Sequence, residues 1–261
     1  MEAHWTPFLE AGKIKWDGGS IPILSSFYHN KFMNETPAVF ALLGQFIGQG
    51  TAVPLFYFLC LTFGPGAAAD ARGPGSKPTT KSGTSFILPL MLAFHTLESF
   101  AAFLAPDPET RHWFTWTWQL LPLWVGLGDA FLSRRFPGAG LGLADETQLG
   151  VLTLIAAGVW GYMLRAAPYS LAAIVWPASL VHDAFVPHAR FVLQLDNICT
   201  FGASFLWMAY SYVGLYRAGV LRGKDCLWVV SLLPVVVTVA GPAAGLVFAS
   251  WWKQKAVGRS I

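Results

Sequence analysis

Seven long apolar runs, separated by stretches rich in glycine, proline and charged residues, organise this sequence. A helix of about 20 apolar residues crosses the core of a lipid bilayer, and most of the runs approach that length. The pattern predicts an all-α fold, a polytopic bundle of about seven transmembrane helices, or six if the fifth run does not cross. The expected spans are residues 38–63, 86–104, 113–133, 149–164, 169–186, 191–216 and 227–252.

The composition supports a membrane location. Of the 261 residues, 54% are hydrophobic and only 12% are charged, whereas a soluble domain has about 25% charged residues. The mean hydropathy is +0.50. We expect one transmembrane domain at 38–252, with an interfacial segment at 1–37 before it and a basic tail at 253–261 after it. We also expect a multi-pass protein of the endoplasmic reticulum, surrounded by membrane lipid.

The charges indicate no macromolecular partner. The formal net charge of +3 is small and is spread along the chain. No basic patch with interleaved aromatic residues is present, so nucleic acid is not an expected ligand. No protein partner is evident, and lysine and arginine divide almost evenly between the two sides, which leaves the orientation in the membrane open.

One acid lies inside the longest apolar run, at 191–216. At helical spacing Asp196 shares a face with Thr200 and Trp207. A carboxylate near the middle of a membrane costs about 3 kcal/mol or more on insertion scales, so such acids face a bundle interior or a cavity. Asp196 therefore either lines a functional cavity or caps the start of its helix.

Further polar residues interrupt the other apolar runs. Gln45 and Gln49 are four residues apart, and His95 and Glu98 are three apart, so each pair shares a helix face. For both pairs, a structural hydrogen bond between helices is the alternative to a functional site. The remaining candidates, from the third, fifth and sixth runs and their aromatic neighbours, are Asp129, His182, Asp183, Asn197, Trp118 and Tyr210.

These residue types favour acid chemistry on an apolar substrate. A carboxylic acid that burial keeps protonated is a general acid, and aromatic faces stabilise nearby cations. No DDxxD, NxxxDxxxD or DxDD motif is present, so magnesium-assisted ionisation of a diphosphate is unsupported. No HExxH metal motif and no GxGxxG dinucleotide motif is present either, so we expect neither a metal nor a cofactor.

Five short stretches carry a resemblance to a known family. They are His29-Asn30-Lys31, Gln45-Phe46-Ile47-Gly48-Gln49-Gly50, Pro54-Leu55-Phe56-Tyr57-Phe58, His95-Thr96-Leu97-Glu98-Ser99 and Asp196-Asn197. In these stretches the chain resembles the fungal integral-membrane terpene cyclases of meroterpenoid biosynthesis. The ascofuranone-pathway type looks closest, and the pyripyropene-type cyclases are the wider relatives.

The resemblance implies a metal-independent cyclase, an isomerase or lyase of secondary metabolism. Such an enzyme protonates an epoxide or alkene of a lipophilic, prenylated small molecule and closes rings through carbocations. The implied acids and bases are Glu98 and Asp196, followed by Asp129 and Asp183. The residues expected to bind the substrate are Gln45, Gln49, His95, Trp118, His182, Asn197, Thr200, Trp207 and Tyr210.

Other functions also fit the polar pattern. Intramembrane acids serve proton relays, so a proton-coupled small-molecule transporter is one alternative. A sterol-isomerase-like lipid isomerase would use the same acids to protonate an alkene without closing a ring. A purely structural membrane protein, with the acids as satisfied pairs, is a further alternative.

Overall fold

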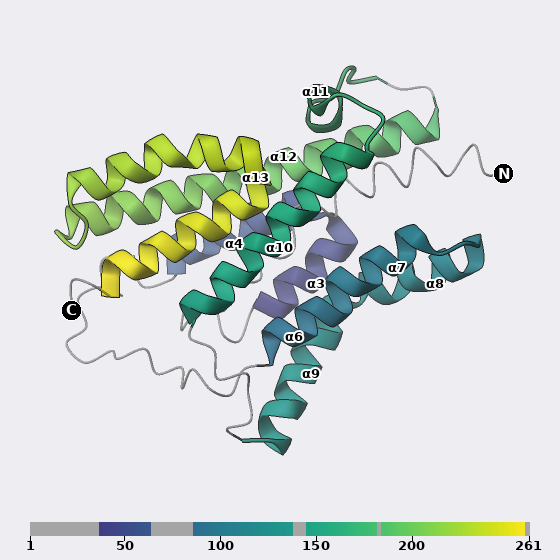
Figure 1. Cartoon of the computed structure of the whole chain (residues 1–261), viewed down its shortest axis with the longest axis horizontal. Helices are drawn as coiled ribbons and strands as arrows, with labels where there is room; N and C mark the ends of the chain where they lie inside the picture. The colour runs from purple at the N-terminus through teal and green to yellow at the C-terminus, as the bar shows by residue number, and fades with distance from the viewer. Residues whose placement is uncertain (1–36, 64–85, 138–144, 182–183, 259–261) are drawn as a thin grey trace.

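A computed structural model describes residues 37–63, 86–137, 145–181 and 184–258, and these residues form helices and no strand (Figure 1). The predicted all-α class is therefore confirmed. Among these described residues, three helical stretches are long and apolar enough to cross a membrane, namely Thr147–Ala166, Pro187–Arg217 and Gly223–Lys253. Three is fewer than seven, so the predicted number of spans is wrong. Of the segments predicted at the ends, residues 1–36 and 259–261 lie outside the described residues.

The first predicted span is two helices rather than one. α3 (Pro37–Ile47) and α4 (Gln49–Phe63) meet at Gly48, whose φ of 87° lies in the left-handed region. That backbone conformation is readily adopted only by glycine, and it ends the helix there. Helix α4 continues through Pro54, so the break falls at the glycine and not at the proline. Neither part reaches the length of a membrane span.

The second predicted span contains a change of helix type. α6 (Ile87–Met91) continues into the π-helix η2 (Leu92–Leu97) and then into α7 (Glu98–Leu104). The third predicted span begins earlier than expected and is also divided, into α8 (Pro108–Gln119) and α9 (Leu121–Arg135). Helices α7 and α8 pack together as a hairpin (Figure 1).

The start of α8 is fixed by a side chain. The carboxylate of Asp107 accepts a hydrogen bond of 2.8 Å from the backbone N–H of Thr110. Hydrogen bonds from Thr110 favour the ionised carboxylate, and they hold the pKa of Asp107 below its ordinary value. Pro108 occupies the first helical position, where a missing N–H costs nothing. Together these features place the beginning of α8 between the second and third predicted spans, at 86–104 and 113–133.

The fourth predicted span is a helix, but the fifth is not a span. α10 (Asp145–Ala166) has 22 residues, whereas α11 (Leu171–Val175) has only five. The side-chain amide of Gln194 donates to the carbonyl oxygens of Ala173 and Ile174, at 2.8 and 2.9 Å, and Arg190 also bonds to the Ala173 carbonyl. These carbonyls lack partners within so short a helix. α11 is therefore a short turn of helix held against the next helix.

The last two helices differ in shape. α12 (Phe185–Arg217) runs for 33 residues, with Pro187 in its first turn. α13 (Gly223–Gly258) bends at Gly241, where φ is 91° and ψ is 159° (Figure 1). A Cβ atom at Gly245 would lie 3.5 Å from Leu233, although a straight helix separates residues 12 apart by about 18 Å. The two halves of α13 thus fold back on each other, and the segment does not cross a bilayer as one straight rod.

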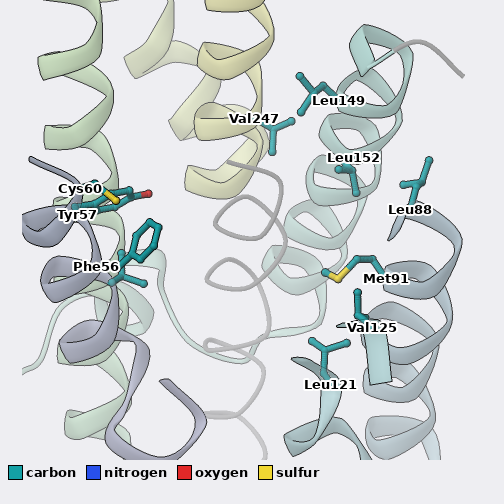
Figure 2. Close-up of a cluster of buried hydrophobic side chains, with 11 residues drawn as sticks. Phe56, Tyr57, Cys60, Leu88, Met91, Leu121, Val125, Leu149, Leu152 and Val247 are labelled. Atoms are coloured by element: carbon teal, nitrogen blue, oxygen red, sulfur yellow. The ribbon is translucent and has the colours of Figure 1, made fainter. Parts of the chain in front are cut away.

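Buried apolar side chains from five parts of the chain form the main core, shown in Figure 2. Phe56 and Tyr57 come from α4, Leu121 and Val125 from α9, and Val247 from the second half of α13. A second cluster joins α12 to α13, where the hydroxyl of Tyr212 donates to the carbonyl of Ala249 at 2.8 Å. These contacts fix the end of α12 against the returning half of α13.

Large apolar side chains cover much of the outer surface. Leu154 on α10 is 75% exposed, Leu206 on α12 is 72% exposed, and Val230 and Val239 on α13 are 70% and 72% exposed. Soluble monomers rarely expose contiguous apolar patches of more than a few hundred Å². The exposed side chains and the three span-length helices indicate association with a membrane. Which membrane is involved, including the endoplasmic reticulum, stays a prediction.

Replacement of Gly241 by alanine tests the bend in α13. The backbone conformation of Gly241 is almost restricted to glycine, with a strain of about 1–3 kcal/mol for other residues. A Cβ atom would also lie 2.8 Å from the buried Trp160 indole. We expect Gly241→Ala to lower the free energy of unfolding by at least about 2 kcal/mol, measured by denaturant titration in detergent. Gly202→Ala is the matched control, because a Cβ atom at Gly202 would meet nothing within 4 Å. Equal losses of unfolding free energy for the two substitutions would contradict the bend at Gly241.

Candidate functional site

Asp196 lies against the break between α3 and α4. Its Oδ1 atom accepts a hydrogen bond of 2.7 Å from the backbone N–H of Gly50, in the first turn of α4. A Cβ atom at Gly48 would lie 2.6 Å from the same oxygen, and one at Gly50 would lie 2.8 Å from the Asp196 carbonyl. The two glycines therefore let α4 and α12 approach closely. The carboxylate caps a helix start within the bundle, where the helix dipole favours a negative charge.

The polar face of α12 packs against α4. Thr200, Ser204 and Ser211 are buried, with exposed fractions of 1%, 2% and 4%. The hydroxyl of Tyr57 donates to Ser204 at 3.4 Å, and the Tyr57 ring stacks on Trp207 with the centroids 5.1 Å apart. The shared face predicted from sequence is thus present, and it forms a helix–helix contact.

The other residues predicted near Asp196 have different surroundings. Trp207 stacks on Tyr210 with the centroids 6.0 Å apart, but Tyr210 itself is half exposed. Asn197 is half buried. Gln45 ends up on α3 and Gln49 on α4, so the break at Gly48 interrupts the helix face on which the sequence placed them. The amide of Gln49 is buried and covers Gly44, where a Cβ atom would lie 2.5 Å away.

Asp129 repeats the arrangement of Asp196 at another helix start. Its Oδ1 atom accepts a hydrogen bond of 2.8 Å from the backbone N–H of Phe86, which directly precedes α6. The first N–H groups of a helix have no partner within the helix. Two acids proposed from the sequence as catalytic groups therefore satisfy backbone groups of other helices.

His95 belongs to a second polar group, on η2, α7 and α8. The imidazole is 1% exposed, and its ring centroid lies 6.2 Å from that of Trp118 on α8. Glu98 is half buried and interacts with the hydroxyl of Thr117, also on α8. His95 belongs to the π-helix η2 and Glu98 is the first residue of α7, so the two residues expected on one helix face lie in helices of different type.

The structure thus divides the predicted site. Asp196, Thr200, Trp207 and Tyr210 lie on α12, where Asp196 and Trp207 contact α4. His95, Glu98 and Trp118 instead lie on η2, α7 and α8. His182 and Asp183 fall outside the described residues. The sequence prediction missed the buried polar side chains of Ser99 and Gln194. Ser99 lies four residues after His95, so the helical spacing already offered a signal for it.

No metal centre forms among the described residues. No group of three or more His, Cys, Asp and Glu side chains in these ranges is arranged to hold a metal ion. The free cysteines are separate, with Cys60 buried on α4 and Cys199 exposed on α12.

Comparison with known proteins gives two relatives with curated names. The FAD-dependent monooxygenase verC1 of Penicillium polonicum is 27% identical over 236 residues, which cover 85% of this chain and 29% of that protein. The FAD-dependent monooxygenase anuJ of Penicillium roqueforti (strain FM164) is 27% identical over 201 residues, which cover 70% of this chain and 24% of that protein. The chain thus spans less than a third of the length of these relatives. No family model and no solved structure matches.

These similarities overturn the function expected from the sequence. The relatives are named as oxidative enzymes, so the resemblance to terpene cyclases and the predicted cyclase, isomerase or lyase reaction are contradicted. The transporter and the lipid isomerase do not fit either. The wider expectation of an enzyme agrees with both names, which belong to oxidoreductases and not to isomerases or lyases. The acid and base roles given to Glu98, Asp129, Asp183 and Asp196 were tied to the cyclase reaction, and no comparison tests these residues.

Substitution of Asp196 tests its role at the break. Asp196→Ala removes the acceptor for the Gly50 N–H, and loss of a hydrogen bond to a charged group costs about 1.5–3 kcal/mol. Asp196→Asn keeps an oxygen acceptor, so we expect a smaller loss of stability, measured by thermal unfolding in detergent. Asn197→Ala is the control, since Asn197 makes no hydrogen bond among the described residues. Equal melting temperatures for Asp196→Ala and Asn197→Ala would rule out the cap.

Proposed function

We propose that this chain is the helical membrane portion of an FAD-dependent monooxygenase, where it anchors the enzyme and receives a lipophilic substrate from the bilayer. The observation that carries the proposal is the similarity to verC1, which extends over 85% of this chain. The three span-length helices and the exposed apolar side chains support a place in the membrane. In this reaction class one atom of dioxygen enters the substrate.

The described residues do not fit a flavin site. A dinucleotide site of the Rossmann type needs a strand followed by a glycine-rich turn at a helix N-terminus. The described ranges contain no strand. More than two thirds of each relative lies outside the matched region, so the proposal places the flavin there, in another part of the enzyme. We therefore derive no reaction step through the flavin from these helices.

A lipophilic, prenylated small molecule remains the substrate class that we propose. The bundle has an apolar outer surface, and it contains buried aromatic side chains such as Phe56, Tyr57 and Trp160. Such a surface lets a lipophilic compound enter from the membrane without crossing water. The proposal thus gives the helices the tasks of anchoring and substrate delivery.

Exchange of the matched region tests the proposed function. We would compare the full Penicillium polonicum protein, a truncated form without the region that matches this chain, and a chimera that carries this chain in its place. The measurements are carbonate-resistant pelleting with membranes, bound FAD by absorbance, and incorporation of labelled dioxygen into prenylated phenols. We expect truncation to retain FAD but to lose pelleting and oxygenation, and the chimera to restore both.

This chain expressed alone supplies the control. We expect it to pellet with membranes and to carry no stoichiometric FAD, because its described helices lack a site for the group. Stoichiometric FAD on this chain alone, or full oxygenation by the truncated protein, would contradict the division of tasks.

A further inference from the structure

The π-helix η2 holds a group of buried polar atoms without partners. Both ring nitrogens of His95, the hydroxyls of Thr96 and Ser99, and the indole N–H of Trp118 have no hydrogen-bond partner among the described residues. His95 is 1% exposed and Ser99 is 4% exposed. More than nine in ten buried polar groups in proteins are hydrogen-bonded, so a cluster of exceptions needs an explanation.

The four residues come from three elements that contact one another, η2, α7 and α8. His95 and Thr96 belong to η2, Ser99 follows on α7, and Trp118 reaches the imidazole from α8. π-Helical turns are rare and are frequent at functional sites. The unpartnered polar side chains therefore lie in and directly beside the π-helical turn. The helices before and after η2 are regular α-helices.

From this coincidence we propose that His95, Ser99 and Trp118 bind the hydroxyl group of a neutral lipophilic ligand. A neutral imidazole offers one donor and one acceptor, a serine hydroxyl offers both, and an indole offers a donor. A ligand hydroxyl donates and accepts at once, so it satisfies this set. The Oε2 atom of Glu98 is also buried without a hydrogen-bond partner among the described residues, and the negative charge of a carboxylate there would repel an anionic ligand.

The surroundings favour an apolar body for the same ligand. Leu92 and Phe94 on η2 pack against the main core, which includes Met91 just before the π-helix and Leu121 and Val125 on α9. Polar groups placed within an apolar lining are the common arrangement of small-molecule sites. The inference rests on the proposed function, because it takes the ligand to be the lipophilic substrate. The experiment below measures ligand binding alone and needs neither flavin nor oxygenation.

Direct binding to the purified full chain in lipid nanodiscs tests the site. The probes are dodecylphenol and its methyl ether, which has the same apolar body but cannot donate a hydrogen bond. We expect His95→Phe to weaken binding of the phenol about tenfold or more, since hydrogen bonds in a dry site are lost. The methyl ether should change by a smaller factor. His112→Phe is the matched control, because His112 is exposed on α8.

The melting temperature of the unliganded protein separates ligand binding from a structural role of His95. If His95 only binds the ligand, His95→Phe should keep this melting temperature, because replacing an unpartnered buried polar group by an apolar group of similar shape is nearly neutral or stabilising. If His95 stabilises the fold, His95→Phe should lower it. Ser99→Ala should weaken phenol binding about fivefold, and it serves as the test if His95→Phe does not fold. Unchanged phenol binding in the variant that folds, equal losses for phenol and ether, or no phenol binding by the unmodified chain would overturn the site. None of these results bears on the exchange of regions that tests the proposed function.

Discussion

The hydrogen bond from the Gly50 N–H to Asp196 is the contact on which the arrangement of the bundle depends. A helix that starts inside an apolar bundle leaves N–H groups that no water reaches. Asp196 on α12 supplies an acceptor and a negative charge at the positive end of α4. Because the donor and the acceptor lie 146 residues apart, the break at Gly48 and the position of α12 stabilise each other. Asp129 does the same for α6 at Phe86.

The sequence was sufficient to predict where most helices lie, but not where they break. Apolar runs placed α10 and α12 nearly correctly, because helix length and hydropathy are local properties. The helices break at Gly48 and Gly241, where the backbone has a positive φ angle. Gly48 lies close to Asp196, and Gly241 lies close to Trp160, so both breaks involve residues that are distant in the sequence. A glycine within an apolar run is equally compatible with close helix packing. The span predicted from the fifth run is wrong because of another contact between distant residues. The side chain of Gln194 donates hydrogen bonds to the carbonyl groups of α11, and this contact allows a short helix where a span was expected.

The fold of α13 bears on how the bundle meets the membrane. Its sequence from Gly223 to Lys253 is the most apolar of the three span-length stretches. Gly241 nevertheless reverses its direction, and Ala243 and Ala244 of the returning half pack on Ala156 of α10. Small side chains allow helices in a membrane to approach closely. The returning half thus lies between α10 and α12, while Val230 and Val239 of the first half stay exposed to the surroundings.

The polar residues of the bundle include two capped carboxylates, Asp196 and Asp129, and a group of neutral side chains around His95 without partners among the described residues. From the sequence, the acids were the first candidates for chemistry, because a charge in an apolar run is costly. In the structure, Asp196 and Asp129 offset that cost by accepting backbone hydrogen bonds. His95, Ser99 and Trp118 are neutral or weakly polar, and their missing partners cost less than an unpaired charge would. A site that must exchange a ligand tolerates such groups more readily than ions, because the unliganded state has to remain folded. The unpartnered neutral groups of η2 are therefore better suited to reversible binding than the two capped carboxylates.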